Sequence, residues 1–242
     1  MARRPVKRLL KRLLYAVAAI IVAIAAVLAA FAVQRARRER LTAEEAAPRG
    51  GRFIQAGDAR VFVQEAGAPG APAVLLVHGT GAWSEIWRGT ITTLAGAGYR
   101  VIAIDVPPFG YSQRLEGAGA FAREKQARRI VAVLDALGIG EVALVGHSVG
   151  ARPTIEAAMS IPSRVRALIL VDPALGFASD EAAPRFEQNH PPLAMRALFG
   201  ARPVFRSIVA AYGTNPSSTG RLFRSFVSRQ EAVTADRIRM LQ

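Results

Sequence analysis

The chain contains no cysteine and only three histidines in 242 residues. The absence of cysteine excludes disulfide bonds and metal sites built from thiolates. The spacing that characterises zinc sites is also absent, and no basic stripe is interleaved with aromatic residues. From these absences we expect no bound metal and no nucleic-acid partner.

Acidic residues are scarce near the N-terminus, which explains most of the formal net charge of +14. Residues 1–40 contain ten Lys and Arg but one Glu, whereas the remainder contains 22 basic and 17 acidic residues. The positive charge therefore belongs mainly to one segment, which removes the main argument for nucleic-acid binding. A length of 242 residues accommodates one substantial domain but not two.

The run from Leu13 to Val33 contains 21 residues with no charged and no strongly polar side chain, mostly Ala, Leu, Ile and Val. At about 1.5 Å per residue, a helix of this length spans roughly 30 Å, the thickness of a bilayer's hydrocarbon core. Basic residues flank both ends of the run: Arg3, Arg4, Lys7, Arg8, Lys11 and Arg12 precede it, and Arg35, Arg37, Arg38 and Arg40 follow it. The larger cluster before the run predicts a single-pass anchor with a cytoplasmic N-terminus and an extracytoplasmic domain.

Two alternatives to the anchor remain at this point. A signal peptide could be cleaved in the Ala-rich sequence near Ala30 and Ala32, although its apolar region is usually only about 7 to 15 residues long. A buried or interfacial helix is the other alternative.

The sequence predicts five segments: a basic tail at residues 1–12, a transmembrane helix at 13–33, a linker at 34–50, a core at 51–172 and a partial helical cap at 173–242. The cap prediction rests on apolar pairs that recur four residues apart, such as 204/205 with 208/209, which is typical of amphipathic helices. No convincing strand follows Pro173.

Within the core, apolar runs alternate with helical patterns. Strands are expected at 52–55, 59–65, 73–77, 100–105, 142–145 and 165–171, and helices at 83–98, 121–137 and 151–159. The first two strands form a hairpin around Gly57-Asp58. This alternation predicts an α/β fold with a mostly parallel sheet and flanking helices. We expect the strand at 165–171 to be buried and the basic run at 123–129 to form a solvated helix face.

The sequence Gly146-His147-Ser148-Val149-Gly150 follows an apolar strand and leads directly into a helix. A serine in a sharp, strained turn between strand and helix stands clear of the backbone and can act as a nucleophile. Glycines on both sides of Ser148 are expected because a Cβ at either position would crowd the neighbouring strand or the turn. We therefore predict that Ser148 is a nucleophile.

Two upstream turns give this pentapeptide its context. Residues 73–77 are followed by His78-Gly79-Thr80-Gly81, and Asp105 opens the sequence Asp-Val-Pro-Pro-Phe-Gly-Tyr-Ser, which ends at Ser112. With these three turns in this order, residues 50–175 resemble the α/β-hydrolase family. The resemblance implies an oxyanion hole formed by the backbone N–H groups of Thr80 and Val149, with a helical cap over the nucleophile. It also implies hydrolysis of an ester or related acyl bond in a small hydrophobic substrate, with no cofactor.

A serine nucleophile needs a general base, normally histidine, that is oriented by an acid. In the resembling family both residues follow two further strands beyond the cap, and the printed sequence ends before such strands. His78 and His147 lie in turns where the family also tends to carry histidine. His190 is the candidate base that follows Ser148 in the chain, although a solvated loop residue is the simpler interpretation. Asp172 is the candidate acid, with a turn-forming role before Pro173 as the alternative.

Two hypotheses fit a hydrolase front half without the late acid and histidine. The chain is either a C-terminally truncated serine hydrolase, which we favour, or a complete chain that has lost catalysis. Loss of the histidine costs on the order of 10⁶ in kcat, so the chain as printed is expected to be nearly inactive. The alternative function is that of a non-catalytic, membrane-anchored binding or scaffold protein with a hydrolase-like fold.

Overall fold

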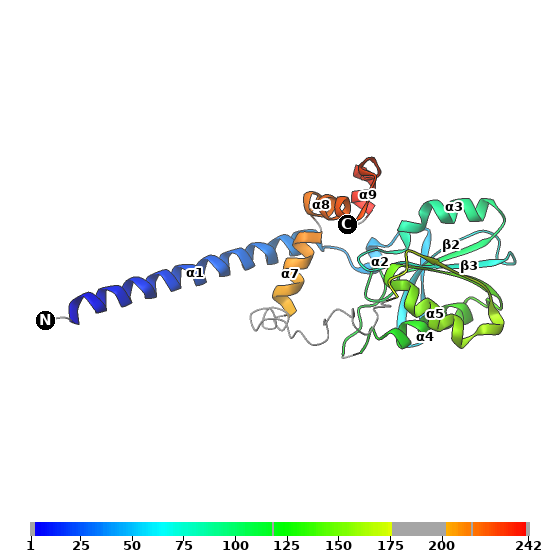
Figure 1. Cartoon of the computed structure of the whole chain (residues 1–242), viewed down its shortest axis with the longest axis horizontal. Helices are drawn as coiled ribbons and strands as arrows, with labels where there is room; N and C mark the ends of the chain where they lie inside the picture. Colours follow the sequence, from blue (N-terminus) through cyan, green and yellow to red (C-terminus); the bar gives the residue numbers. More distant parts are fainter. Residues whose placement is uncertain (1–2, 118, 176–201, 214, 241–242) are drawn as a thin grey trace, which may run out of the picture. The chain divides into compact units, whose positions relative to one another are not determined.

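A computed structural model of the chain describes residues 3–117, 119–175, 202–213 and 215–240 (Figure 1). The chain divides into two compact units. One unit holds Leu41–Pro184, and the other holds Met1–Arg40 together with Arg185–Met240.

The first unit is built on a six-stranded sheet with the order β1-β2-β4-β3-β5-β6. The strands are β1 (Gly51–Ala56), β2 (Ala59–Ala66), β3 (Ala73–Val77), β4 (Arg100–Ile104), β5 (Val142–His147) and β6 (Val165–Val171). The pairs β3/β4, β3/β5 and β5/β6 are parallel. The hairpin β1/β2 and the pair β2/β4 are antiparallel. The predicted α/β class and the predicted hairpin are therefore confirmed.

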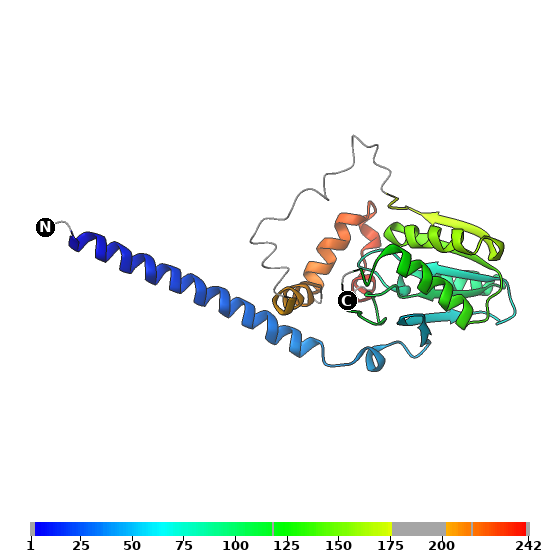
Figure 2. The ribbon, with the colours of Figure 1, turned by 90° about the horizontal axis from the view of Figure 1, so that it is seen from below.

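Helices cover both faces of this sheet (Figures 1 and 2). The helices α4 (Arg123–Ala136) and α5 (Ala151–Ser160) pack on one face, over a buried layer that includes Leu75, Ile102 and Leu144. On the other face, the short 3-10 helix η1 (Ser84–Trp87) and α3 (Arg88–Gly96) cover Leu76, Ala103 and Val145. Since β3, β4, β5 and β6 run parallel, their C-terminal ends meet at one edge, where the loops that follow them converge.

The basic run at 123–129 is not a uniformly solvated helix face, because Arg129 is buried. Its guanidinium group donates to both carboxylate oxygens of Asp58, at 2.7 and 2.9 Å, and to the carbonyl of Ala120 at 2.8 Å. These bonds with Arg129 lower the pKa of Asp58. The ion pair of buried Arg129 with exposed Asp58 ties α4 to the β1/β2 turn.

The prediction that the strand at 165–171 is buried was wrong. The strand forms at those residues as β6, but Leu168, Ile169 and Val171 are 40%, 43% and 40% exposed. The reason is its position: β6 is an edge strand that pairs only with β5 among the described residues. Apolar side chains on such an edge remain accessible unless another segment covers them.

The second unit contains α1 (Arg3–Arg38), a single helix that includes residues 3–12 of the predicted tail and the whole predicted span, and continues into the predicted linker. Within it, Lys11–Arg37 has the length and apolar composition of a membrane span, and a signal sequence near the N-terminus meets the same criteria. The short helix α2 (Ala43–Ala46) lies in the predicted linker, and Thr42 caps it through a capping box with Glu45.

The same unit includes three more described helices, which agree with the predicted amphipathic pattern. These are α7 (Arg202–Gly213), α8 (Pro216–Phe226) and α9 (Ala235–Met240), with a 3-10 turn, η4 (Gln230–Ala232), before α9.

Candidate active site

Ser148 occupies the turn between β5 and α5 with a φ of 52°, in the left-handed region that side chains other than glycine rarely adopt. The neighbouring glycines allow this turn. A Cβ on Gly146 would lie 2.8 Å from the Cα of Ala151, and one on Gly150 would collide with the carbonyl oxygen of His78. The predicted strained turn and its steric need for glycine are therefore confirmed, while the role of Ser148 as nucleophile stays a prediction.

The turn after β3 lies directly against this serine. A Cβ built on Gly79 would be 2.8 Å from the Cβ of Ser148, so the backbone of that turn and the serine are in close contact. Thr80 is the next residue of this turn. Val149 lies in the first turn of the helical segment, where backbone N–H groups lack intrahelical acceptors. The structure thus brings the two segments that carry the predicted oxyanion-hole donors together, and the hole itself remains a prediction.

Asp172 follows β6 and lies beside the serine turn along the backbone. In the β5/β6 register Val171 pairs with His147, and the N–H of Ala174 donates to the carbonyl of Ser148 at 3.1 Å. Asp172 has a φ of 45° and is exposed. A turn-forming role for this aspartate agrees with that backbone conformation. Its role as the acid is a prediction that the geometry permits.

His78 is fully engaged in structure. Its Nδ1 lies 2.7 Å from the carbonyl oxygen of Gly79, and its Nε2 accepts the N–H of Val106 at 2.9 Å. The neutral tautomer with a proton on Nδ1 satisfies both contacts. Burial lowers the pKa of His78 to about 4. A histidine held in this way links the β3 and β4 turns and is not available as a general base.

His147 is held on the face of the sheet that α3 covers. Its ring lies 6.1 Å from the ring of Trp87, edge to face, and its Nδ1 is buried without a hydrogen-bond partner among the described residues. The sequence did not predict the contact with Trp87. His147 is the last residue of β5, and Ser148 follows it in the turn. The Nδ1 of His147 makes no hydrogen bond to Ser148, so the described residues do not show His147 acting as its base. His190 lies outside the described residues.

Asp105 organises the loop after β4, as its place in the Asp-Val-Pro-Pro-Phe-Gly sequence indicated. Its buried carboxylate accepts the N–H groups of Ser84 at 2.7 Å and Tyr111 at 2.8 Å. Ser112 donates to the carbonyl of Asp105 at 2.6 Å and accepts the N–H of Phe62. Burial raises the pKa of the Asp105 carboxyl, against the effect of these donors. The loop is therefore held by buried polar bonds together with ring contacts such as that of Phe109 with His78.

His78 gives a prediction for the pH dependence of stability. Its pKa is about 4 in the folded protein, against 6.5 when unperturbed, so between these values the unfolded chain binds more protons. The stabilisation is complete above about pH 6.5 and is lost as the pH falls towards about 4. His78→Gln keeps an acceptor for the N–H of Val106 but does not titrate. Between about pH 7 and about pH 4.5, its free energy of unfolding should fall by roughly 2 to 3 kcal/mol less than that of wild type.

This difference is measured by urea unfolding followed by the fluorescence of Trp83 and Trp87, which lie in the first unit. Asp105 titrates in the opposite sense and is present in both proteins, so the subtraction removes its contribution. Equal pH dependence in the two proteins would show that His78 ionises normally in the folded state.

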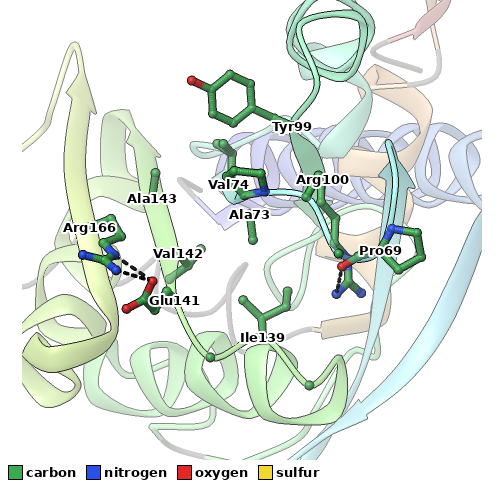
Figure 3. Close-up of a pocket in the computed structure, with 15 residues that line it drawn as sticks. Pro69, Ala73, Val74, Tyr99, Arg100, Ile139, Glu141, Val142, Ala143 and Arg166 are labelled. Atoms are coloured by element: carbon green, nitrogen blue, oxygen red, sulfur yellow. Dashed lines mark hydrogen bonds and ion pairs between the residues drawn. The ribbon is translucent and has the colours of Figure 1, made fainter.

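A cavity in the first unit is lined by residues that do not include Ser148, and Figure 3 shows several of them. It has a volume of about 630 Å³ and is lined by residues at the N-terminal ends of the parallel strands, including Ala73, Arg100, Val142 and Arg166. Arg166 pairs with Glu141 there at 2.6 Å. Since β5 rises by roughly 3.3 Å per residue, Val142 and Ser148 are roughly 20 Å apart. This cavity is therefore not a binding pocket for the predicted nucleophile.

Comparison with known proteins identifies the family. A family model for the alpha/beta hydrolase fold matches residues 72–204. Epoxide hydrolase A of Mycobacterium tuberculosis is 36% identical over 150 residues, which cover 57% of this chain and 44% of that protein. The 2-hydroxy-6-oxononadienedioate/2-hydroxy-6-oxononatrienedioate hydrolase of Burkholderia vietnamiensis is 37% identical over 120 residues, 48% of this chain and 41% of that enzyme. The chain spans less than half the length of these two relatives.

A solved structure supports the same assignment. A meta-cleavage product hydrolase from Pseudomonas fluorescens superimposes with a TM-score of 0.58 at 25% identity, over 79% of this chain and 62% of that one. The region that the family model matches, residues 72–204, contains β3, β4, β5 and β6 with their connecting turns. The chain therefore belongs to the α/β-hydrolase fold family.

Proposed function

We propose that the protein is a hydrolase that cleaves an ester or a related acyl bond through Ser148. The observation that carries the proposal is the position of this serine, in a left-handed turn at the C-terminal end of β5 and against the backbone of Gly79. In this family a residue at that place faces the substrate, and a strained conformation is kept where function requires it.

The chemistry follows from the groups around Ser148. Its Oγ adds to the carbonyl carbon of the substrate as a base removes the hydroxyl proton, and the carbonyl oxygen becomes an oxyanion. The N–H groups of Thr80 and Val149 are the proposed donors to this oxyanion. Collapse of the tetrahedral intermediate expels the leaving group and leaves an acyl-enzyme, which water hydrolyses to regenerate Ser148.

The relatives include both epoxide hydrolases and hydrolases of 2-hydroxy-6-oxo compounds. The identity of residue 148 favours carbonyl chemistry over epoxide opening, because family members that open epoxides use a carboxylate as the nucleophile at this turn. The oxo group of the 2-hydroxy-6-oxo compounds is a carbonyl, which an alcohol nucleophile can attack. We therefore assign a small hydrophobic substrate with a reactive carbonyl to this site.

The base and the acid are the incomplete part of the proposal. His78 is held by two structural contacts, and the Nδ1 of His147 makes no hydrogen bond to Ser148, so the proposed base is His190. Asp172 is the proposed acid, since it lies beside the Ser148 turn at the end of β6. If His190 is the base, His190→Ala should lower kcat by a factor on the order of 10⁶.

Labelling with a fluorophosphonate probe tests the function. The natural full-length protein is expected to be phosphonylated in minutes, because the probe reacts with activated serines and not with ordinary ones. His190→Ala abolishes labelling if His190 is the base, and has no effect if the base lies elsewhere. No labelling of the natural protein would favour the alternative, a binding or scaffold protein without turnover.

We also propose that residues 13–33 anchor the protein in a membrane with the N-terminus in the cytoplasm. The six basic residues before the run and the uninterrupted helix α1 support this arrangement. After membrane fractionation and washing with alkaline carbonate, we expect the intact chain to stay with the membranes. Release of a chain that retains its N-terminus would contradict the anchor, and a shorter product that begins near Ala30 would show a cleaved signal peptide.

A further inference from the structure

The excess of basic over acidic residues beyond the N-terminal segment lies mainly in the last helices. Residues 202–240 contain seven arginines and two carboxylates, whereas residues 41–175 contain 13 basic and 12 acidic residues. The α/β unit is thus nearly neutral, and the helical segment carries a local positive charge. A local field of this kind selects anionic partners.

Five of these arginines are exposed: Arg221, Arg224, Arg229, Arg237 and Arg239. Arg239 is paired with Asp236 at 2.8 Å. The other four have no carboxylate within ion-pair distance among the described residues, and Arg237 only donates to the carbonyl of Ala232. Four guanidinium groups are therefore free to meet an external anion.

Large apolar side chains are exposed on the same helices. Val209 and Tyr212 on α7 are 51% and 55% exposed, and Leu222 on α8 is 52% exposed. Val209 and Tyr212 are three residues apart and so share one side of their helix. Elsewhere the helices pack against one another, since Thr219 donates to the carbonyl of Gly213 and a Cβ on Gly220 would lie 3.0 Å from Ile238. The exposed apolar groups are therefore not used in packing within the described residues.

We propose that this helical segment binds the surface of an anionic phospholipid bilayer. Val209, Tyr212 and Leu222 enter the interfacial region, while the four unpaired arginines meet the phosphate groups of the lipids. Amphipathic helices with arginine and exposed apolar residues bind lipid in this way, whereas a nucleic-acid surface has no use for the aliphatic groups. The proposal rests on the proposed anchor only because the anchor brings the segment close to a membrane.

The absence of cysteine provides a direct test. Leu222→Cys creates one site for a dye whose emission moves to shorter wavelength in an apolar environment. The labelled full chain is reconstituted into vesicles of phosphatidylcholine alone, or of equal parts of phosphatidylcholine and phosphatidylglycerol. We expect a blue shift and quenching by lipid-borne quenchers only in the anionic vesicles. High salt should reverse both effects, because it screens the arginines.

Charge reversal gives the matched comparison. Since each arginine near an anionic membrane changes the bound-to-free ratio roughly five-fold, Arg221→Glu with Arg224→Glu should lower it at least roughly 25-fold. Arg114→Glu with Arg128→Glu, which reverses two exposed charges of the α/β unit, should change nothing. Far-ultraviolet circular dichroism confirms that each variant keeps the helical content of wild type.

The proposal is overturned by any of three results. These are no blue shift in anionic vesicles, an equal shift in phosphatidylcholine alone, and a shift that appears with duplex DNA but not with phosphatidylglycerol. Failure of the anchor is a separate result, because the chain then leaves the membranes in carbonate. If the chain stays with the membranes after carbonate washing but the dye shows no blue shift, the anchor is supported and the lipid-binding surface is contradicted.

Discussion

Ser148→Ala should lower kcat for the hydrolysis of p-nitrophenyl esters by a factor on the order of 10⁶. The expectation follows from the proposed role of the hydroxyl, since no other group at this turn can form the acyl-enzyme. Ser163→Ala, which changes an exposed serine of the same unit, is the matched control and should keep full activity.

Ser148→Gly separates loss of chemistry from loss of structure. Ser148 has a φ of 52°, where glycine is more stable than a residue with a Cβ by roughly 1 kcal/mol. The glycine variant should therefore be inactive and yet melt about 2 to 4 °C higher than wild type. An active glycine or alanine variant would contradict the assignment of Ser148. A variant that melts below wild type would show that the turn is not strained.

Gly150→Ala should be among the most destabilising single substitutions in the α/β unit. Gly150 has a φ of −65°, so its backbone conformation is open to alanine and the cost is purely steric. The added Cβ would lie 3.0 Å from the carbonyl carbon of His78 and closer still to its oxygen. These are backbone atoms of the β3 turn, and they can move only if that turn is displaced. We expect a loss of roughly 3 kcal/mol, at the upper end for overpacking.

The displacement should also impair catalysis, because the turn that moves carries Thr80. Thermal unfolding followed by tryptophan fluorescence should place the midpoint of Gly150→Ala about 10 °C below wild type. The matched control is Gly96→Ala, at the end of α3, where an added Cβ meets nothing within 4 Å and should stabilise the helix slightly. If both variants melted like wild type, the β3 turn and the serine turn would not be in contact.

The β1/β2 hairpin, the parallel core and the serine turn were predictable because each rests on a local pattern, whereas the order of the strands in the sheet was not predicted. Apolar runs that end in glycine-containing turns identify β3 and β5. The glycines on both sides of Ser148 indicate a turn that has no room for a Cβ. The glycine pattern around Ser148 thus reflects contacts with a turn roughly 70 residues earlier in the chain, which the structure shows as the approach of Gly150 to His78.

Two features were not predictable because they depend on partners distant in the sequence. Arg129 belongs to a run that has the pattern of a solvated face, and only its pairing with Asp58, 71 residues away, places it in the interior. The strand β6 has the apolar composition of a central strand, yet its exposure depends on which segments lie beside it. The apolar composition of a strand indicates that its burial is favourable, but it does not identify the segment that would pack on it.

The most direct test of the account is to locate the fluorophosphonate adduct on the natural protein by mass spectrometry. Trypsin leaves the Arg152–Pro153 bond intact, so Ser148, Ser160 and Ser163 fall in one peptide, and fragmentation within that peptide distinguishes them. We predict a single adduct on the Oγ of Ser148. An adduct on another serine, or none on the natural protein, would contradict the claim that Ser148 is the nucleophile.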